Sequence, residues 1–107
     1  MRASLRFGTG RTVPVPTDVR NDEARSRYEL VLDGEVIGIA DYRIEGDEVV
    51  FPHTEIDPAF RGRGFGEVLV QGAMEDVRAA GRTVVPRCWF VVEFLELHPE
   101  FADLRAA

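Results

Sequence analysis

The chain has 107 residues, of which 45% are apolar and 30% are charged, and its formal net charge is −6. This composition predicts one small globular domain and excludes a largely disordered chain. No run approaches the roughly 18 apolar residues of a membrane span, and the acidic balance argues against a broad basic face for nucleic acid and favours a cationic partner such as an amine.

Residues 1–22, MRASLRFGTGRTVPVPTDVRND, contain several glycines and prolines and show little periodicity. They predict an N-terminal arm with room for one short strand. The first ten residues lack the apolar centre of a signal peptide, and Cys88 is the only cysteine, so we expect a cytoplasmic protein without internal disulfides. The domain itself is predicted over residues 23–107, as a monomer or a weak homodimer.

Three strands are predicted to follow the arm. RYELVLDGEVIGIADYRI indicates two strands joined at Asp33-Gly34, which is a strong hairpin signal. After a second turn at EGDE, VVFPHTEI predicts a third strand, in which alternate residues from Val49 to Glu55, His53 included, share one face. The three strands are expected to form an antiparallel meander.

Two helices are predicted in the second half of the chain. Apolar residues recur at helical spacing from Phe65 to Ala80, and Gly81 ends a helix of about 15 residues. TVVPRC predicts a short strand, and WFVVEFLELHPE predicts a second helix that stops before Pro99, with Trp89 and Phe90 in the core. Because a strand-helix-strand unit of this length forms a right-handed crossover, strands 49–56 and 83–88 are expected to be parallel neighbours.

Each of these two strands contains a proline, Pro52 in the first and Pro86 in the second. Proline has no N–H for a ladder and belongs at edges or bulges, whereas a parallel pair is expected inside the sheet. We therefore predict that the two strands separate partway along and leave a cleft beside His53 and Cys88.

Three glycines precede the first helix in the segment RGRGFG. Glycine in a helix costs about 0.5–1 kcal/mol relative to alanine, so Gly64 and Gly66, with Gly62 just before them, indicate close approach of something to the backbone. The free N–H groups and the dipole of a helix start favour phosphate, and Arg61 and Arg63 flank the site. The segment lacks the Gly-Lys-Ser/Thr of a Walker loop and the glycine spacing of a dinucleotide fingerprint. It also looks like a fragment of an Arg-Gly RNA-binding segment, but those segments are repetitive and this one leads into an amphipathic helix.

Arg61, Gly64 and Gly66 match the pattern Arg/Gln-x-x-Gly-x-Gly/Ala, and the segment resembles the acetyl-CoA pyrophosphate loop of the GNAT superfamily of N-acetyltransferases. With RYELVLDG, HTEI, PRCWFV and HPEF, the chain from about Val19 to Leu104 resembles the minimal single-domain branch of this superfamily. The resemblance implies an α/β (α+β) fold: a mixed, mainly antiparallel twisted sheet with a β-α-β crossover and splayed central parallel strands, with the pantetheine arm of CoA in the gap. It implies no metal, and it implies a CoA site formed by Glu55, Ile56, Arg61, Gly62, Arg63, Gly64, Phe65 and Gly66.

Acyl transfer to an amine also needs a base for the amine proton, a hydrogen-bond donor to the thioester carbonyl (an oxyanion donor) and a group that stabilises or protonates the leaving thiolate. His53 is the candidate base, and a backbone N–H near residues 53–55 is the candidate oxyanion donor. Many larger GNAT enzymes use a tyrosine after the fifth strand as the acid, but this chain has no tyrosine there. The resemblance to the minimal branch implies that Cys88 takes its place, either as the proton donor to the thiolate or as a nucleophile that attacks the thioester. The alternatives are a structural His53 and a Cys88 that acts as a small buried hydrophobe.

Three functions remain open at this stage. The first is an N-acetyltransferase that moves an acetyl group from acetyl-CoA to a primary amine of a small molecule, a polyamine or a protein lysine. The second is a non-catalytic acyl-CoA-binding or partner-docking module of the same fold. The third, an RNA-binding protein, agrees least with the acidic balance.

Overall fold

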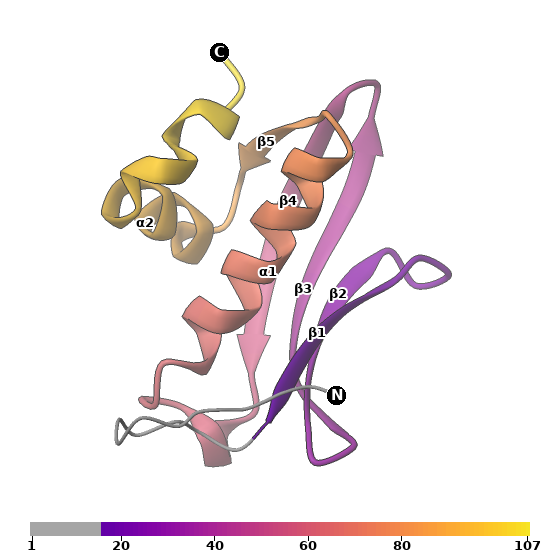
Figure 1. Cartoon of the computed structure of the whole chain (residues 1–107), viewed down its shortest axis with the longest axis vertical. Helices are drawn as coiled ribbons and strands as arrows, with labels where there is room; N and C mark the ends of the chain where they lie inside the picture. The colour runs from indigo at the N-terminus through magenta and orange to yellow at the C-terminus, as the bar shows by residue number, and fades with distance from the viewer. Residues whose placement is uncertain (1–15) are drawn as a thin grey trace.

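The structure is a computed structural model that describes residues 16–107, which form one five-stranded sheet with two α-helices and two short 3-10 helices (Figure 1). The elements in chain order are β1 (Thr17–Asp22), β2 (Arg27–Leu32), β3 (Glu35–Glu45), β4 (Glu48–Ile56), η2 (Pro58–Phe60), α1 (Phe65–Ala79), β5 (Thr83–Pro86), α2 (Trp89–Leu97) and η3 (Pro99–Leu104).

Strand β1 lies inside the segment that the sequence assigns to an N-terminal arm. Its six residues pair antiparallel with β2, from Thr17 opposite Leu32 to Asp22 opposite Arg27. These residues are therefore the first strand of the sheet. The rest of the predicted arm, residues 1–15, lies outside the described residues.

The sheet is mixed, as predicted. Strands β2, β3 and β4 form the antiparallel meander, and β4 pairs with β5 in parallel across the α1 crossover. The parallel pair is not central, however, because the strand order within residues 16–107 is β1-β2-β3-β4-β5, and that prediction was wrong. After β5 the chain enters α2 and η3 and returns to β5 only at its end, where the N–H of Ala106 donates to the carbonyl of Val84 at 2.8 Å.

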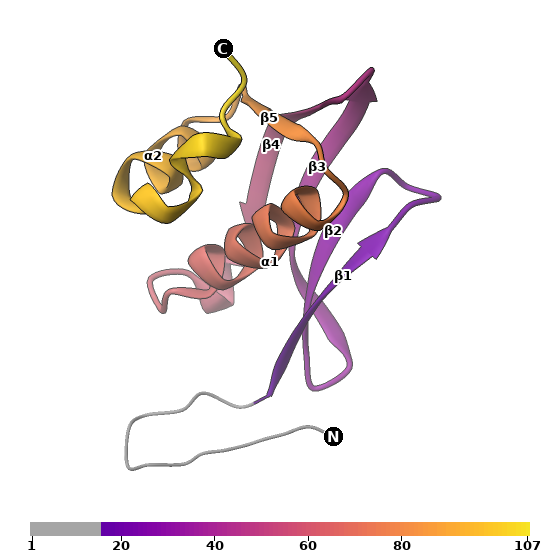
Figure 2. The same cartoon turned by 45° about the horizontal axis from the view of Figure 1, so that its top comes forward.

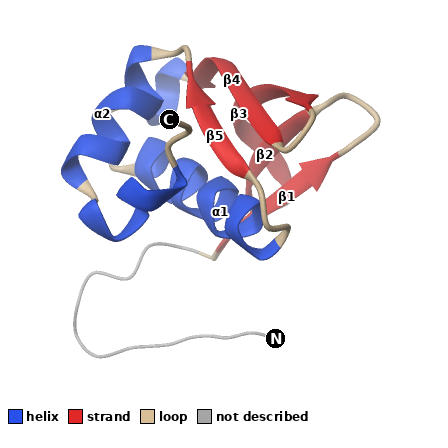
Figure 3. Cartoon of the chain, turned by 90° about the horizontal axis from the view of Figure 1, so that it is seen from above, coloured by secondary structure: helices blue, strands red, loops and turns tan. Residues whose placement is uncertain are grey.

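Both helices pack side by side on one face of the sheet (Figures 2 and 3). The periodicity of α1 explains its orientation, because Leu69, Ala73 and Val77 are fully buried against the strands while Glu67, Gln71 and their neighbours on the other side are exposed. Each fully buried leucine or valine contributes about 1.5–3 kcal/mol to this packing. No helix in the described part of the chain is long and apolar enough to cross a membrane.

Candidate functional site

The parallel strands β4 and β5 separate after four residue pairs. The last pair is Phe51 with Pro86, and the N–H of Arg87 donates to the carbonyl of Phe51 at 3.0 Å. Strand β4 then continues to Ile56 beside β3 alone. The predicted gap therefore exists, and it begins at the two prolines that predicted it.

Pro52 lies in a bulge of the β3–β4 pair. Arg43 is opposite Val50 and Asp41 is opposite His53, so two residues of β4 face the single residue Tyr42. A proline is tolerated at such a position because the ladder is already interrupted there.

The bulge changes which side chains of β4 face the helices. Thr54 is opposite the buried Ala40, whereas His53 and Glu55 are about half exposed, at 54% and 55%. The prediction that His53 and Glu55 share a face with Val49 was therefore wrong, because one inserted residue reverses a period-two pattern.

The same register shows where the backbone N–H groups of β4 point. The N–H of Asp57 donates to the carbonyl of Ile37 at 2.7 Å, and the antiparallel pairing alternates from there. The N–H groups of Thr54 and Ile56 consequently face away from β3, into the gap. Within residues 53–55, the N–H that faces the gap is thus that of Thr54.

The three glycines around the start of α1 have two different roles. Gly62 (φ 76°) and Gly64 (φ 82°) adopt the left-handed conformation, which other residues rarely adopt, and a Cβ at either would meet no atom within 4 Å. A Cβ at Gly66 would lie 2.5 Å from Cζ of Phe90. The close approach that Gly66 indicates is therefore made by a ring of α2.

The turn at residues 62–67 leaves its amides free. The first helical bond of α1 is donated by Val68 to Gly64 at 3.3 Å, and the N–H groups of residues 62–67 have no hydrogen-bond partner within the part of the chain that the structure describes. Arg61 is tied to β4 by a bond from Nε to the carbonyl of Ile56 at 3.1 Å. Free amides, the positive end of the helix dipole and a guanidinium together favour an anion at this turn.

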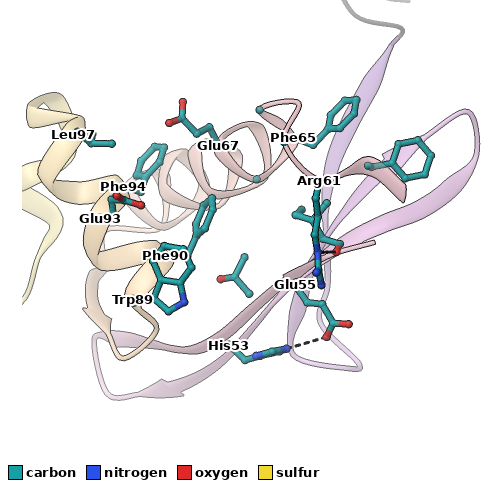
Figure 4. A pocket seen from close by; sticks show the side chains of 16 residues that line it. His53, Glu55, Arg61, Phe65, Glu67, Trp89, Phe90, Glu93, Phe94 and Leu97 are labelled. Atoms are coloured by element: carbon teal, nitrogen blue, oxygen red, sulfur yellow. Dashed lines mark hydrogen bonds and ion pairs between the residues drawn. The ribbon is translucent and has the colours of Figure 1, made fainter. Parts of the chain in front are cut away.

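One pocket of about 630 Å³ joins this turn to the gap, bounded by β4 on one side and by α2 on the other (Figure 4). Its lining contains most of the predicted site residues, namely His53, Glu55, Ile56, Arg61, Gly62, Gly64, Phe65 and Gly66. The lining residues that the sequence analysis did not select are Thr54, Phe60, Glu67, Trp89, Phe90, Glu93, Phe94 and Leu97.

Trp89 is the clearest of these omissions. It was predicted to lie in the core, yet it is 72% exposed at the start of α2 and points toward His53 across the pocket (Figure 4). Trp89, Glu93 and Leu97 follow one another at a spacing of four, which places them on one face of the helix. That spacing is the signal in the sequence that could have identified this wall.

Two predicted site residues do not line the pocket. Cys88 lies just before α2 and packs partly buried against the core. Arg63 is exposed, with its guanidinium carbon 5.8 Å from the centre of the Phe60 ring. The expected cleft thus opens beside His53 but not beside the Cys88 side chain.

The charges around the pocket are mixed. Glu55, Glu67 and Glu93 line it together with the single guanidinium of Arg61. Glu67, in the first turn of α1, has Oε1 3.6 Å from Nε2 of His98. No three His, Cys, Asp or Glu side chains of residues 16–107 are grouped so that they could hold a metal ion.

His53 and Glu55 form a pair at the pocket edge. Nε2 of His53 lies 3.0 Å from Oε1 of Glu55, and the dashed line in Figure 4 marks this contact. A carboxylate in this position can accept a hydrogen bond from Nε2–H and so orient the imidazole, which leaves Nδ1 as the ring acceptor. The pair therefore places an oriented imidazole at the pocket edge.

Comparisons with known proteins identify the family. A profile described as GCN5-related N-acetyl-transferase matches residues 27–104. Protein NATD1 of Bos taurus is 28% identical to the chain over 86 residues, which are 78% of this chain and 76% of that protein.

Solved structures agree on the fold. A GCN5-like protein from Staphylococcus aureus superimposes with a TM-score of 0.65 at 18% identity, over 84% of this chain and 88% of that chain. N-acetylglutamate synthase from Neisseria gonorrhoeae, solved with coenzyme A and N-acetyl-glutamate, gives a TM-score of 0.51 at 20% identity over 57% of this chain, which spans 15% of that protein. Since the family profile covers most of the sequence, the chain belongs to the GCN5-related N-acetyltransferase family.

Proposed function

We propose that the protein transfers an acetyl group from acetyl-CoA to a primary amine of a small molecule, a polyamine or a protein lysine. The observation that carries the proposal is the single pocket that joins the free amides at the start of α1 to the gap between β4 and β5. Family membership supports acetyl transfer in general, and a structural neighbour was solved with coenzyme A.

The residues at the turn fit the diphosphate of CoA. Gly62 and Gly64 hold the backbone in a conformation that directs several N–H groups outward, and Arg61 adds a guanidinium beside them. Glu67, in the first turn of α1, carries a negative charge that opposes this attraction. The acyl arm of the donor then extends along β4, where the N–H of Thr54 can donate to the thioester carbonyl as charge develops on its oxygen.

The acceptor reacts as the neutral amine, so a base must take its proton. His53 is our candidate, because it lines the pocket and Glu55 orients its ring. The carboxylates of the lining favour the approach of a cationic amine before it loses that proton. Cys88 remains a candidate acid or nucleophile only if its side chain turns from the core toward the gap.

Binding of the donor is tested by thermal unfolding with and without acetyl-CoA. A ligand bound only by the native state at a hundredfold excess over its Kd adds about 2.7 kcal/mol of stability, so the midpoint should rise clearly. Arg61→Gln should reduce the rise, and Arg82→Gln, an exposed arginine that does not line this pocket, is the matched control. No rise in the unsubstituted protein at millimolar acetyl-CoA would end the proposal.

A second function is favoured by one observation, namely that the residues lining the pocket include neither a tyrosine nor a cysteine. A non-catalytic acyl-CoA-binding module would bind acetyl-CoA without turnover. Release of free CoA should be measured with small amines, spermidine and a lysine peptide as acceptors. Release that disappears in His53→Ala while acetyl-CoA binding persists supports the enzyme; binding without release from any acceptor supports the module.

A further inference from the structure

Thr54 carries a hydroxyl that the fold leaves without a partner. Its Oγ1 is buried and, among residues 16–107, it is the only buried side-chain nitrogen or oxygen that makes no hydrogen bond. The residue lines the pocket between β4 and α2.

The surroundings of Thr54 explain why no protein group satisfies it. The residue opposite it on β3 is Ala40, which has no polar side-chain atom. On its other side β5 has ended at Pro86, so no strand lies beside it there. Ile56, two residues along the same face of β4, is apolar. An unpartnered buried hydroxyl destabilises a fold by the equivalent of about a 5- to 150-fold change in the unfolding equilibrium. Valine has nearly the same shape without that cost, so folding alone does not favour threonine at this position.

We infer that the Thr54 hydroxyl hydrogen-bonds the acyl-CoA donor where its arm passes β4, after a rotation about χ1 that brings the buried Oγ1 to the pocket surface, and so acts as a donor-binding residue. This inference rests on the proposed function. The arm offers suitable groups, because its amides donate and accept hydrogen bonds and its thioester carbonyl accepts them, and a hydroxyl can do either. The N–H of the same residue faces the gap in the plane of the sheet while the side chain stands roughly perpendicular to it. One residue thus presents two differently directed polar groups to one ligand.

The test is Thr54→Val, which should produce two changes of opposite sign. Without ligand the variant should be more stable, with an unfolding constant about fivefold lower or better, because a buried unpartnered hydroxyl is gone. Its Kd for acetyl-CoA, measured by titration calorimetry, should rise about 2- to 12-fold, because a hydrogen bond to the ligand is lost. Thr54→Ser, which keeps the hydroxyl, should bind within about twofold of the unsubstituted protein. Thr83→Val, on β5 outside the pocket, should leave the Kd unchanged.

Titration with CoA beside acetyl-CoA tells the two ligand groups apart. An equal loss of affinity for both places the contact on the arm, and a loss with acetyl-CoA alone places it on the thioester carbonyl; both results support the inference. If the unsubstituted protein binds acetyl-CoA and Thr54→Val binds it equally well, the inference is overturned while the proposed function stands. A Thr54→Val protein that is less stable than the parent would also overturn it, because the hydroxyl would then have a partner in the fold. No binding by the unsubstituted protein overturns both.

Discussion

Replacing Gly64 with alanine separates two expected roles of this residue, namely to adopt the left-handed conformation of the turn and to direct the N–H groups that follow it toward an anion. Its backbone has φ 82° and ψ 5°, and a Cβ there would meet no atom within 4 Å. The substitution therefore adds no clash, and its cost is the left-handed conformation alone, about 1–2 kcal/mol for a residue with a Cβ. For a domain of this size that cost lowers the midpoint of thermal unfolding by roughly 4–10 °C.

The chain provides a matched control in Gly46, in the turn between β3 and β4. Gly46 also has a positive φ, 63°, and a Cβ there would also meet nothing within 4 Å. Gly46→Ala should therefore destabilise the protein by about the same 1–2 kcal/mol. It lies outside the pocket, so its effect on ligand binding should be nil.

The assay compares midpoints with and without saturating acetyl-CoA in three proteins. The parent and Gly46→Ala should show the same ligand-induced rise, because their α1 turns are identical. Gly64→Ala should show a smaller rise, since relief of the strain redirects the N–H groups that follow residue 64. A full rise in Gly64→Ala would refute the assignment of this turn as the anion site, and a stability loss in only one variant would refute the strain argument.

Three further predictions concern the rest of the fold. Gly66→Ala should destabilise the protein by about 1–3 kcal/mol in urea unfolding, because its Cβ meets the Phe90 ring at 2.5 Å. In a protein that also carries Phe90→Leu, the same substitution should stabilise the fold by about 0.5–1 kcal/mol, because alanine is the better helix former. An effect of the same sign in both backgrounds would contradict the contact. Burial, with a hydrogen bond to the carboxylate of Asp76, raises the pKa of Tyr28, so the folded state favours the neutral phenol. The stability of the protein should therefore fall as pH rises above the free value of about 10. Tyr28→Phe should flatten this dependence of stability on pH, and an unchanged slope in the variant would count against Tyr28 as its source. The hydrogen bond from Arg78 lowers the pKa of Asp103, so the pair stabilises the fold above about pH 4 and this stabilisation is lost as pH falls below that value. The midpoints of thermal unfolding of Asp103→Asn and of the parent should therefore converge in acid. A difference that stays constant with pH would exclude the ion pair as its source.

Local signals in the sequence predicted most of the architecture because each acts over a few residues. The Asp33-Gly34 turn has positive φ at both residues, 51° and 80°, which is the geometry that made this pair a hairpin signal. Gly81, also left-handed at 72°, follows the end of α1 where the apolar periodicity stops. Such features need no knowledge of distant contacts, and the strand and helix assignments that depend on them were confirmed.

The face of β4 was mispredicted for a physical reason. Period-two counting assumes that no residue is inserted, and the bulge at Pro52 inserts one, so the side chains beyond it exchange faces. The proline showed that the ladder was interrupted but not how many residues the interruption held. Thr54 was therefore treated as an ordinary strand residue, although its side chain faces the pocket that the helices cover. The prediction that Trp89 lies in the core was wrong for a similar reason. An apolar run in the sequence does not show which of its residues stay exposed to solvent.

The prolines mark the gap, but the missing donor of Pro86 does not cause it. Thr83 and Arg87 donate their N–H groups to the carbonyls of Asp47, just before β4, and of Phe51 in β4. Because N–H groups alternate in direction along a strand, residue 86 would have directed an N–H away from β4 in any case. What ends the pairing is the path of the chain, which leaves the sheet after Pro86 and enters α2 at Trp89. Val91, Phe94 and Leu95 of α2 are buried in the core, and the ring of Phe90 lies against Gly66 at the start of α1. A side chain larger than glycine at position 66 would therefore have to displace Phe90, which lines the pocket on the α2 side, opposite β4.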